Sequence, residues 1–475
     1  MPAESFVAGN AKAFRKDGLG FYEDCERLGP IVETRMYHLR VWIVTGPTLI
    51  EEILVKNPKA FTKNRVVKLL KLVFGEGLLT SEGDLQKHRR RMLQPVFHTK
   101  HNAGYASVIR AGTERMLARF RDGEVRNVAP DLVRLCIANM TEIFFGVVDD
   151  ELSAQIESLA HFCHEMAAEM TKPWFFLYAM IPPLVDVRFE RRFRALEAGV
   201  MSRVELLRKR SRLAGDSTSR DDLYNRLVNG NDLDGCPMRP AAVRDEVVTM
   251  FLAGHETAAA AVCWALDLLA GHPDVRRRLV EELDGVCGDA LPSFEDLARL
   301  PYLDKVLLET YRLYPPTHAI GRTVVQPCSV GGVRLAPGDE IIIPTWAIHR
   351  SARHYEDPTA FRPERWTPEA VSILPRFAYL PFSGGPRICI GQALVTMEDA
   401  LIVGSIVKRF DFDLVESERA RPREGLTLLR GAHGDTPLRL RARTATRHQH
   451  GPSVPCTPLS SHRLLAVADE DEDVA

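Results

Sequence analysis

The ten residues FSGGPRICIG (382–391) set a single cysteine, Cys389, among three glycines and an arginine. The next segment, IGQALVTMEDALIVGSIVKRF, repeats apolar residues at helical spacing, so Cys389 is expected at or just before a helix N-terminus. There the free backbone amides and the helix dipole favour an anion, and Arg387 adds positive charge nearby. The glycines permit tight turns and the close approach of a large flat object. The stretch therefore predicts a stabilised thiolate.

A stabilised thiolate can act as a nucleophile or as a metal ligand. The chain has nine cysteines and no C-x-x-C pair, which argues against a disulfide scaffold and a structural zinc ribbon. Zinc takes four ligands, whereas haem iron needs one proximal protein ligand and accepts a thiolate. A buried structural cysteine is the plain alternative. A second cluster, His161, Cys163 and His164, offers no fourth ligand at a plausible spacing and is interpreted as core or pocket.

Five positions of the opening stretch fit the pattern F-x-x-G-x-R-x-C-x-G: Phe382, Gly385, Arg387, Cys389 and Gly391. The pattern resembles the haem-binding segment of the cytochrome P450 monooxygenases. The resemblance implies haem b (iron protoporphyrin IX) as cofactor, with Cys389 as axial ligand of the iron and Phe382, Arg387 and Gly391 at the cofactor. Because electron donation from a thiolate favours O–O cleavage, it also implies oxygen activation with O2 and externally supplied electrons.

A second motif, AGHET (253–257), lies inside a long apolar helical stretch. A glycine within a helix costs about 1 kcal/mol relative to alanine, which is tolerable where something must lie close to the backbone. The Thr257 hydroxyl can bond back to the carbonyl of residue 253, and Glu256 beside it completes an acid–alcohol pair able to relay protons. The segment resembles the oxygen-activation motif of the same family. It implies that Glu256 and Thr257 are catalytic and that Ala253 and Gly254 contact the haem.

A third motif is ETYR, in which Glu309 and Arg312 share one helix face. An exposed pair of this kind contributes less than about 1 kcal/mol. The helix is apolar, however, and a buried pair needs further partners, of which Arg365 in FRPERW is a candidate. The resemblance implies that Glu309, Arg312 and Arg365 form a structural network on the haem side.

The same family places arginines against the haem propionates, where a guanidinium fork suits a carboxylate. In GDLQKHRRRMLQPVFH (83–98) the matching residue is Arg90, and Arg322 and Arg387 match two further propionate arginines. Gln86 stands where the family carries tryptophan or histidine, which puts one propionate contact in doubt. A solvated surface arginine is the alternative at each position.

The composition is that of an ordinary globular protein: 475 residues, 45% hydrophobic and 26% charged, with a net charge of −1. A balance so close to zero provides no broad basic field for nucleic acid. The resemblance implies a mainly α fold with a smaller β-rich region (α+β), the cytochrome P450 fold, with a long central helix over the haem. One domain is expected over 1–445, followed by a disordered Pro/Ser-rich and acidic tail over 446–475.

The coarse pattern agrees with this class. Periodicity and turn residues predict the following elements: a hairpin over 31–45, mostly helices over 47–314 with a polar loop at 214–240, a long helix over 245–271, strands within 323–344, a helix after Cys389, and short strands near 410–415 and 426–440.

The substrate is expected to be a hydrophobic small molecule, such as a terpenoid, steroid, fatty acid or polyketide, that is hydroxylated or epoxidised in secondary metabolism. By position in the family, we expect these residues to line the pocket: Val66, Leu69, Val73, Met170, Phe176, Met250, Thr317, His318 and Ile320. His255 and His318 would add polar contacts.

The resemblance is to a soluble, cytoplasmic, bacterial member that acts as a monomer. The N-terminal residues lack an apolar stretch, so no membrane anchor is expected. No flavin or ferredoxin domain is evident, so electrons should come from a separate ferredoxin and its reductase. We expect the basic side chains of Lys87, Arg89 and Arg91 to help an acidic ferredoxin dock.

Three other interpretations remain. One keeps the haem and uses peroxide, or isomerises rather than oxygenates. Another is a haem-containing gas sensor or binding protein without catalysis. The last is free of haem and uses Cys389 as a reactive nucleophile. The acid–alcohol pair Glu256–Thr257 favours the oxygenase over the first two.

Overall fold

The computed structural model describes residues 9–146, 223–415, 421–431 and 434–443, together with single residues and short stretches between 151 and 206. It divides into two compact units that interleave along the chain. Unit 1 contains Met1–Leu69, Phe120–Asn127 and Ala260–Ala475, and unit 2 contains Leu70–Arg119 and Val128–Ala259. The single domain over 1–445 stays a prediction, and the tail 446–475 lies outside the described residues.

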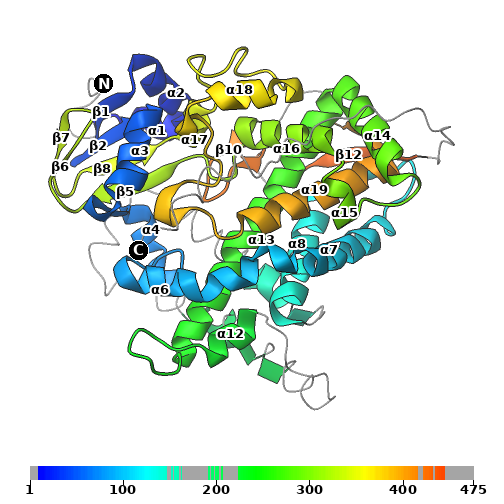
Figure 1. Ribbon diagram of the computed structural model, residues 1–475, viewed down its shortest axis with the longest axis horizontal. Coiled ribbons are helices and arrows are strands. Elements are labelled where there is room, and N and C mark those ends of the chain that lie inside the picture. The colour runs from blue at the N-terminus through cyan, green and yellow to red at the C-terminus, as the bar shows by residue number, and fades with distance from the viewer. Residues whose placement is uncertain are drawn as a thin grey trace. The chain divides into compact units, whose positions relative to one another are not determined.

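Unit 1 is built on a five-stranded sheet of order β1-β2-β8-β5-β3. The predicted hairpin is confirmed: β1 (Ile31–Met36) and β2 (Leu39–Val44) pair antiparallel and reverse at Tyr37, whose φ is 54°. β8 (Glu340–Ile343) lies parallel to β2 and antiparallel to β5 (Ile320–Val324), and β3 (Phe61–Lys63) closes the edge (Figure 1).

Both faces of this sheet are covered, which explains the unbroken apolar run VWIV at 41–44. Trp42 and Val44 pack into one hydrophobic cluster with residues of β8 and of the chain that follows β2. Val41 and Ile43 point to the other face, where they pack against Phe21 and other residues of α2. Alternate side chains of a strand point to opposite faces, so each face requires its own apolar set.

Smaller sheets complete unit 1. The strands expected within 323–344, near 410–415 and near 426–440 are confirmed. In β6–β7 the turn residues Gly331 and Gly332 have φ of 55° and 80°, the left-handed conformation that a two-residue hairpin turn requires. The remaining strands are β6 (Cys328–Val330), β7 (Val333–Leu335), β4 (Val125–Asn127), β9 (Phe410–Leu414), β12 (Pro437–Ala442), β10 (Pro422–Arg423) and β11 (Leu429–Arg430).

Helices surround these sheets. The helix predicted after Cys389 is confirmed as α19, and its end at Arg409 leads directly into β9. The helices of unit 1 are α1 (Ala11–Lys16), α2 (Gly18–Leu28), α3 (Pro47–Glu51), α4 (Arg65–Leu69), α14 (Pro273–Cys287), α15 (Phe294–Leu297), α16 (Pro301–Leu313), α17 (Thr345–Ile348), α18 (Pro368–Ile373) and α19 (Gln392–Arg409).

The described part of unit 2 is almost wholly helical: α5 (Lys71–Phe74), α6 (Gly83–Leu93), α7 (Asn102–Leu117), α8 (Ala129–Phe145) and α12 (Leu223–Asn229). α7 and α8 pack closely where Gly112 faces Asn139, since a Cβ at Gly112 would lie 2.5 Å from the Asn139 Oδ1. The polar loop predicted over 214–240 is wrong where α12 lies. Leu223 and Leu227, four residues apart, are both fully buried and provide a helical apolar face.

The longest helix, α13 (Pro240–Gly271), begins five residues before the predicted start, with Pro240 as its first helical residue. Proline suits that position because its φ is already helical and its missing N–H would have no partner there. Among the described residues, α13 alone is long and apolar enough to cross a membrane by length and composition, yet 72% of its most apolar window is buried inside the protein. We therefore interpret α13 as a core helix, as expected.

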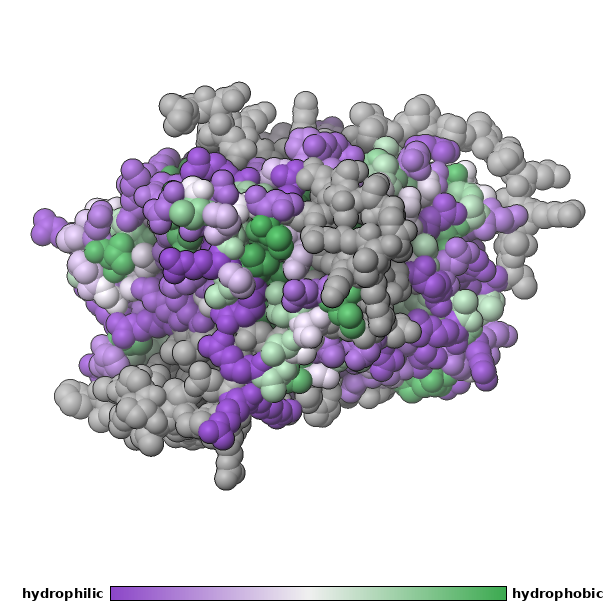
Figure 2. Space-filling view, turned by 90° about the horizontal axis from the view of Figure 1, so that it is seen from below, coloured by the Kyte–Doolittle hydropathy of each residue, from purple (hydrophilic) through white to green (hydrophobic). Residues whose placement is uncertain are grey.

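Figure 2 shows one face of the molecule, on which hydrophilic residues predominate among those coloured and hydrophobic ones occur singly or in small groups. Large apolar side chains that are exposed, such as Leu28 and Ile373, are scattered along the described chain. Scattered apolar residues are ordinary for a globular surface.

Candidate functional site

Cys389 sits at the end of a closed backbone loop that precedes α19. Its N–H donates to the Phe382 carbonyl at 3.0 Å, and the Ile388 N–H donates to the Gly385 carbonyl at 2.9 Å. Gly385 has a φ of 66°, and a Cβ there would lie 2.1 Å from the Leu54 carbonyl oxygen, so only glycine fits. α19 begins three residues after Cys389, as the sequence predicts.

The thiol of Cys389 is exposed. By contrast, burial raises the pKa of Cys25 and of Cys263 to about 11, which keeps those thiols protonated. Cys236 is also exposed, and its N–H donates to the carboxylate of Asp232. Of the cysteines that the structure describes, Cys389 therefore has the setting best suited to an anionic ligand.

The loop is supported from behind by an aromatic contact. The Phe382 ring meets the Tyr311 ring edge to face, with centroids 5.5 Å apart. The Tyr311 hydroxyl donates to the buried carboxyl of Asp399 at 2.7 Å, and burial raises the pKa of Asp399 well above its ordinary value. This contact joins the cysteine loop to α16 and α19.

The predicted association of Glu309, Arg312 and Arg365 is present in the structure. Arg312 is fully buried and donates to both carboxylate oxygens of Glu309 at 2.8 Å. Arg365 donates to Glu309 at 2.9 Å, and so does the indole of Trp366 at 3.0 Å. A buried charge that is paired and fully hydrogen-bonded is tolerated, whereas an unpaired one is not.

His349, which the sequence analysis did not single out, links this network toward the cysteine loop. Its Nδ1 lies 3.1 Å from the Arg312 carbonyl, and its Nε2 accepts from the Leu380 N–H at 2.9 Å. Burial and the charge of Arg312 lower the pKa of His349 to about 3, so the ring is neutral, with its proton on Nδ1. Leu380 lies two residues before Phe382. Arg312 and the cysteine loop are therefore connected through one imidazole ring.

The AGHET segment contains the accessible residues in the middle of α13, which we call the notch. Between residues 245 and 269 of this helix, only Ala253, Gly254, Glu256 and Thr257 are not buried. The Thr257 hydroxyl donates to the Ala253 carbonyl at 2.9 Å, as predicted. Four of the five motif residues are thus the accessible ones in the stretch 245–269 of this helix.

Two residues of the AGHET segment have further contacts within unit 2. Gly254 faces Met140 of α8, since a Cβ at Gly254 would lie 2.6 Å from the Met140 methyl carbon. His255 is buried, and its Nδ1 lies 2.5 Å from the Phe251 carbonyl of the same helix. His255 therefore has one contact within α13, and its expected polar contact with the substrate stays a prediction.

The three arginines matched to the propionates lie on separate elements. Arg90 is half-buried on α6 in unit 2. In unit 1, Arg387 is half-buried in the cysteine loop, and Arg322 is buried on β5 and donates to the Gly321 carbonyl at 2.9 Å. Their contact with a propionate stays a prediction.

The docking role expected for Arg89 is wrong, because its side chain is buried. Its Nε lies 3.5 Å from a carboxylate oxygen of the fully buried Glu246, and its Nη1 lies 3.3 Å from the Met238 sulfur. Lys87 and Arg91 are exposed on the same helix. A run of adjacent basic residues on one helix necessarily includes both exposed and inward-facing positions.

The expected pocket residues have varied environments. Met250 is buried, Val66 and Thr317 are exposed, and Ile320 packs in the hydrophobic cluster of the five-stranded sheet. Burial lowers the pKa of His318 to about 4, so its ring is neutral. The side chains of Leu69 and Val73 lie outside the described residues, as do Met170, Phe176 and the cluster His161, Cys163 and His164.

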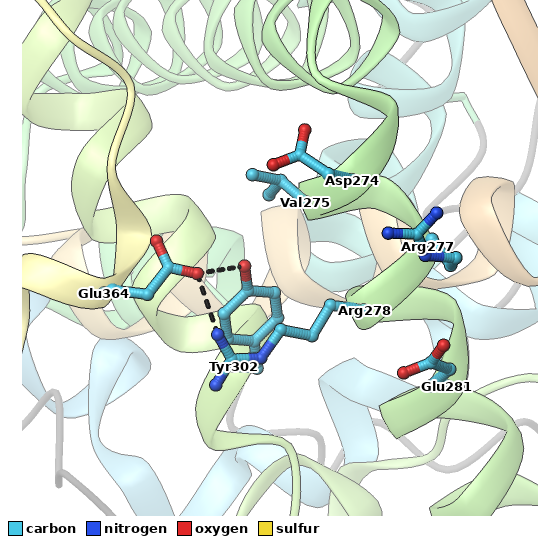
Figure 3. Close-up of a pocket in the computed structure, with 7 residues that line it drawn as sticks. All are labelled: Asp274, Val275, Arg277, Arg278, Glu281, Tyr302 and Glu364. Atoms are coloured by element: carbon cyan, nitrogen blue, oxygen red, sulfur yellow. Dashed lines mark hydrogen bonds and ion pairs between the residues drawn. The ribbon is translucent and has the colours of Figure 1, made fainter.

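A surface depression of about 430 Å³ lies elsewhere in unit 1 (Figure 3). Its lining is polar: Glu364 accepts from Arg278 at 2.9 Å and from the Tyr302 hydroxyl at 2.7 Å, and the Arg278 guanidinium lies over the Tyr302 ring. Arg278, Tyr302 and Glu364 thus contact one another, and the lining contains none of the predicted site residues. We do not assign a function to it.

The residues present fit a haem. An exposed thiol stands at a glycine-shaped loop before a helix N-terminus, where a thiolate is stabilised, and the accessible notch of α13 offers a hydroxyl beside a carboxylate. A lone thiolate of this kind supplies the one proximal protein ligand that haem iron needs. Cys389 would hold the iron, and the propionate role of the three arginines stays a prediction.

Comparison with known proteins gives matches over nearly the whole chain. A family model described as Cytochrome P450 matches residues 2–434. The chain is 29% identical to Cyclooctatin synthase of Streptomyces melanosporofaciens, over 91% of this chain and 93% of the relative. It is 29% identical to Cyclooctat-9-en-7-ol 5-monooxygenase of the same organism, over 90% of each chain. It is 27% identical to Pentalenene oxygenase of Streptomyces avermitilis, over 93% of this chain and 96% of the relative.

Proposed function

This chain belongs to the cytochrome P450 family, and from that premise we propose that it hydroxylates or epoxidises a terpenoid, using a haem b held by Cys389. The family and the monooxygenases among its relatives make it an oxidoreductase of the monooxygenase type. The observation that carries the proposal is the exposed Cys389 thiol at the end of a glycine loop that leads into α19.

The substrate class is supported by the names of the relatives. Pentalenene and cyclooctat-9-en-7-ol are, by their names, an alkene and an alkenol, and therefore largely apolar molecules. Apolar substrates are bound mainly by apolar side chains, with few polar groups to fix orientation. Met250, one turn before the AGHET notch on α13, would provide such a contact.

When bound, the haem supplies the iron that binds O2 and the oxidising chemistry. The role of Thr257 is proton delivery. Its hydroxyl donates to the Ala253 carbonyl. When that hydrogen bond breaks, the hydroxyl can deliver its proton while its oxygen lone pairs accept another from Glu256 or water.

The substrate proposal is tested by a spectral titration of the haem-replete protein. Cyclic terpene hydrocarbons and their mono-alcohols should displace the water on the iron and produce a type I shift, with oxygenated product when electrons are supplied. Fatty acids of equal carbon number serve as the matched panel. A shift with the fatty acids but not with the terpenoids would contradict the substrate class.

Replacement of Thr257 by alanine is expected to uncouple electron use from product formation. A positioned proton donor contributes about 10²–10⁴-fold, so product per electron pair should fall at least about tenfold while peroxide rises. The measurement is product and hydrogen peroxide formed per reducing equivalent consumed. Thr257→Ser, which keeps the hydroxyl, should retain the coupling; unchanged coupling in the alanine variant argues against the assigned role.

Electrons are proposed to come from a separate ferredoxin and its reductase, with the enzyme acting as a cytoplasmic monomer. Lys87 and Arg91 are exposed and can face an acidic ferredoxin. The double variant Lys87→Glu/Arg91→Glu should weaken ferredoxin affinity at low salt and much less at high salt, because exposed charges are screened. An affinity that is unchanged at low salt would remove these residues from the docking surface.

A further inference from the structure

Glu246 is a fully buried carboxylate in the first turns of α13 that no motif accounts for. One of its oxygens accepts from the Leu78 N–H at 3.0 Å. The other lies 3.5 Å from Arg89 Nε and has no hydrogen-bond partner among the described residues. A buried charge with an unsatisfied oxygen is costly. Keeping the ionised Glu246 carboxylate buried at this point therefore costs folding free energy.

What Glu246 holds is the turn 75–81, which follows α5. Next to Glu246, Asp245 accepts from the Glu76 N–H at 2.8 Å. The turn lies directly on the helix, since a Cβ at Gly77 would lie 2.1 Å from Thr249 Oγ1 and 2.7 Å from the Asp245 carbonyl oxygen. Two consecutive carboxylates thus fasten consecutive parts of one turn to one end of α13.

This end of α13 leads to the accessible notch. Met250 and Ala253 follow Glu246 at i+4 and i+7, and Thr257 follows at i+11, so all four lie along one face of the helix. Seven residues of helix span about 10 Å. The fastened turn therefore covers the same helix face about two turns before the residues assigned to oxygen chemistry.

We propose that Glu246 is a positioning residue that fastens the turn 75–81 to α13, and that its ionisation sets how readily this turn opens toward the substrate site. The assignment of the notch to a substrate site rests on the proposed function. The fastening itself rests only on contacts within unit 2.

The direction of the pH effect follows from the groups around Glu246. From α6, Arg89 faces it; from the turn, the Leu78 amide faces it, while the Glu76 side chain pairs with Lys71. On α13 itself lies Asp245, which is paired with Arg244.

Desolvation outweighs Arg89 and the amide, and it raises the pKa of Glu246 from 4.5 to about 7 in the closed form. Opening would hydrate the group and return its pKa toward 4.5. The closed form therefore binds the proton more tightly, and opening becomes easier as the pH rises from about 4.5 to about 7, by up to about tenfold per pH unit.

Amide hydrogen exchange of Glu76 and Leu78 tests the fastening. After correction for the intrinsic pH dependence of exchange, protection of Leu78 should fall on the order of tenfold between pH 5.5 and pH 7.5. Glu246→Gln, which stays neutral, should remove this dependence. The matched control is Glu282→Gln: Glu282 accepts from the Tyr302 and Leu303 amides at 2.7 and 2.9 Å, has a pKa raised by burial, and belongs to unit 1. In that variant the dependence at Leu78 should persist.

The link to the site is tested on the haem-replete protein with 4-phenylimidazole, which binds iron and reports by its spectrum. Only the neutral imidazole binds iron, so the association rate is divided by the fraction of neutral ligand at each pH. The corrected rate should rise on the order of tenfold between pH 5.5 and pH 7.5 in the unmodified chain, and should not rise in Glu246→Gln. Leu78 protection that is independent of pH in the unmodified chain overturns the fastening. If amide exchange depends on pH but the association rate does not, control of access by Glu246 is overturned. A chain that binds no haem contradicts the proposed function, but the exchange experiment still decides the fastening.

Discussion

Replacing Cys389 with serine is expected to abolish thiolate ligation and the strongly red-shifted Soret band of the reduced carbon monoxide complex. The loop closed by the Cys389–Phe382 hydrogen bond uses the backbone N–H, which serine keeps, so the fold around α19 should survive. A hydroxyl is not deprotonated at neutral pH and cannot replace the electron donation of a thiolate. Oxygenated product should therefore fall to the background level.

The matched control for this substitution is Cys236→Ser. Cys236 is also exposed, but it lies in the turn before α13, where its N–H donates to the carboxylate of Asp232. The reduced carbon monoxide spectrum of this variant should equal that of the unmodified chain. A thiolate spectrum retained in Cys389→Ser, or lost in Cys236→Ser alone, would contradict the assignment of the ligand.

Replacing Glu309 with glutamine is expected to have the largest effect on stability. The side chain of Arg312 is fully buried, and its Nε and Nη2 donate to the Glu309 carboxylate. The substitution would leave this guanidinium without its carboxylate partner. Breaking a buried ion pair by removing one partner costs about 3–5 kcal/mol. Because Arg365 and Trp366 also donate to Glu309, their contacts should weaken together with it.

The measurement is the urea midpoint of the haem-replete protein, together with the fraction of haem retained after purification. Glu356→Gln provides the matched control, since the Glu356 side chain forms an exposed pair with Arg362 at 3.7 Å and the backbone carbonyl that accepts from Arg365 is kept. Its midpoint should stay near that of the unmodified chain because exposed pairs contribute little. Equal midpoints for the two variants would show that the Glu309 network does not carry stability.

Much of the fold was accessible from the sequence because the apolar patterns are unambiguous. The run VWIV and the turn at Tyr37 predict the first hairpin, and the spacing after Cys389 predicts α19. The helix α12 was missed because its two buried leucines stand in a stretch of polar and turn-forming residues. The polar composition of the segment predicted a loop. The four-residue spacing of Leu223 and Leu227 indicates a helix only once tertiary packing buries both side chains.

The site was accessible to the extent that its chemistry is local in the chain. The hydroxyl of Thr257 bonds four residues back, and Glu309 meets Arg312 three residues on. Contacts between distant segments were not accessible. A sequence cannot say which arginine of HRRR turns inward, and the buried partner of Arg89 is more than 150 residues away at Glu246. His349 was missed for the same reason, since its partners are Arg312 and Leu380.

The central claim is that the sulfur of Cys389 holds the iron of a haem. The most direct test is the absorption spectrum of the purified, haem-replete, unmodified chain after reduction and exposure to carbon monoxide. Ligation by the Cys389 thiolate predicts a Soret band that is strongly red-shifted from that of a histidine-ligated haem. A protein that binds no haem, or a carbonyl spectrum typical of nitrogen ligation, would contradict the claim.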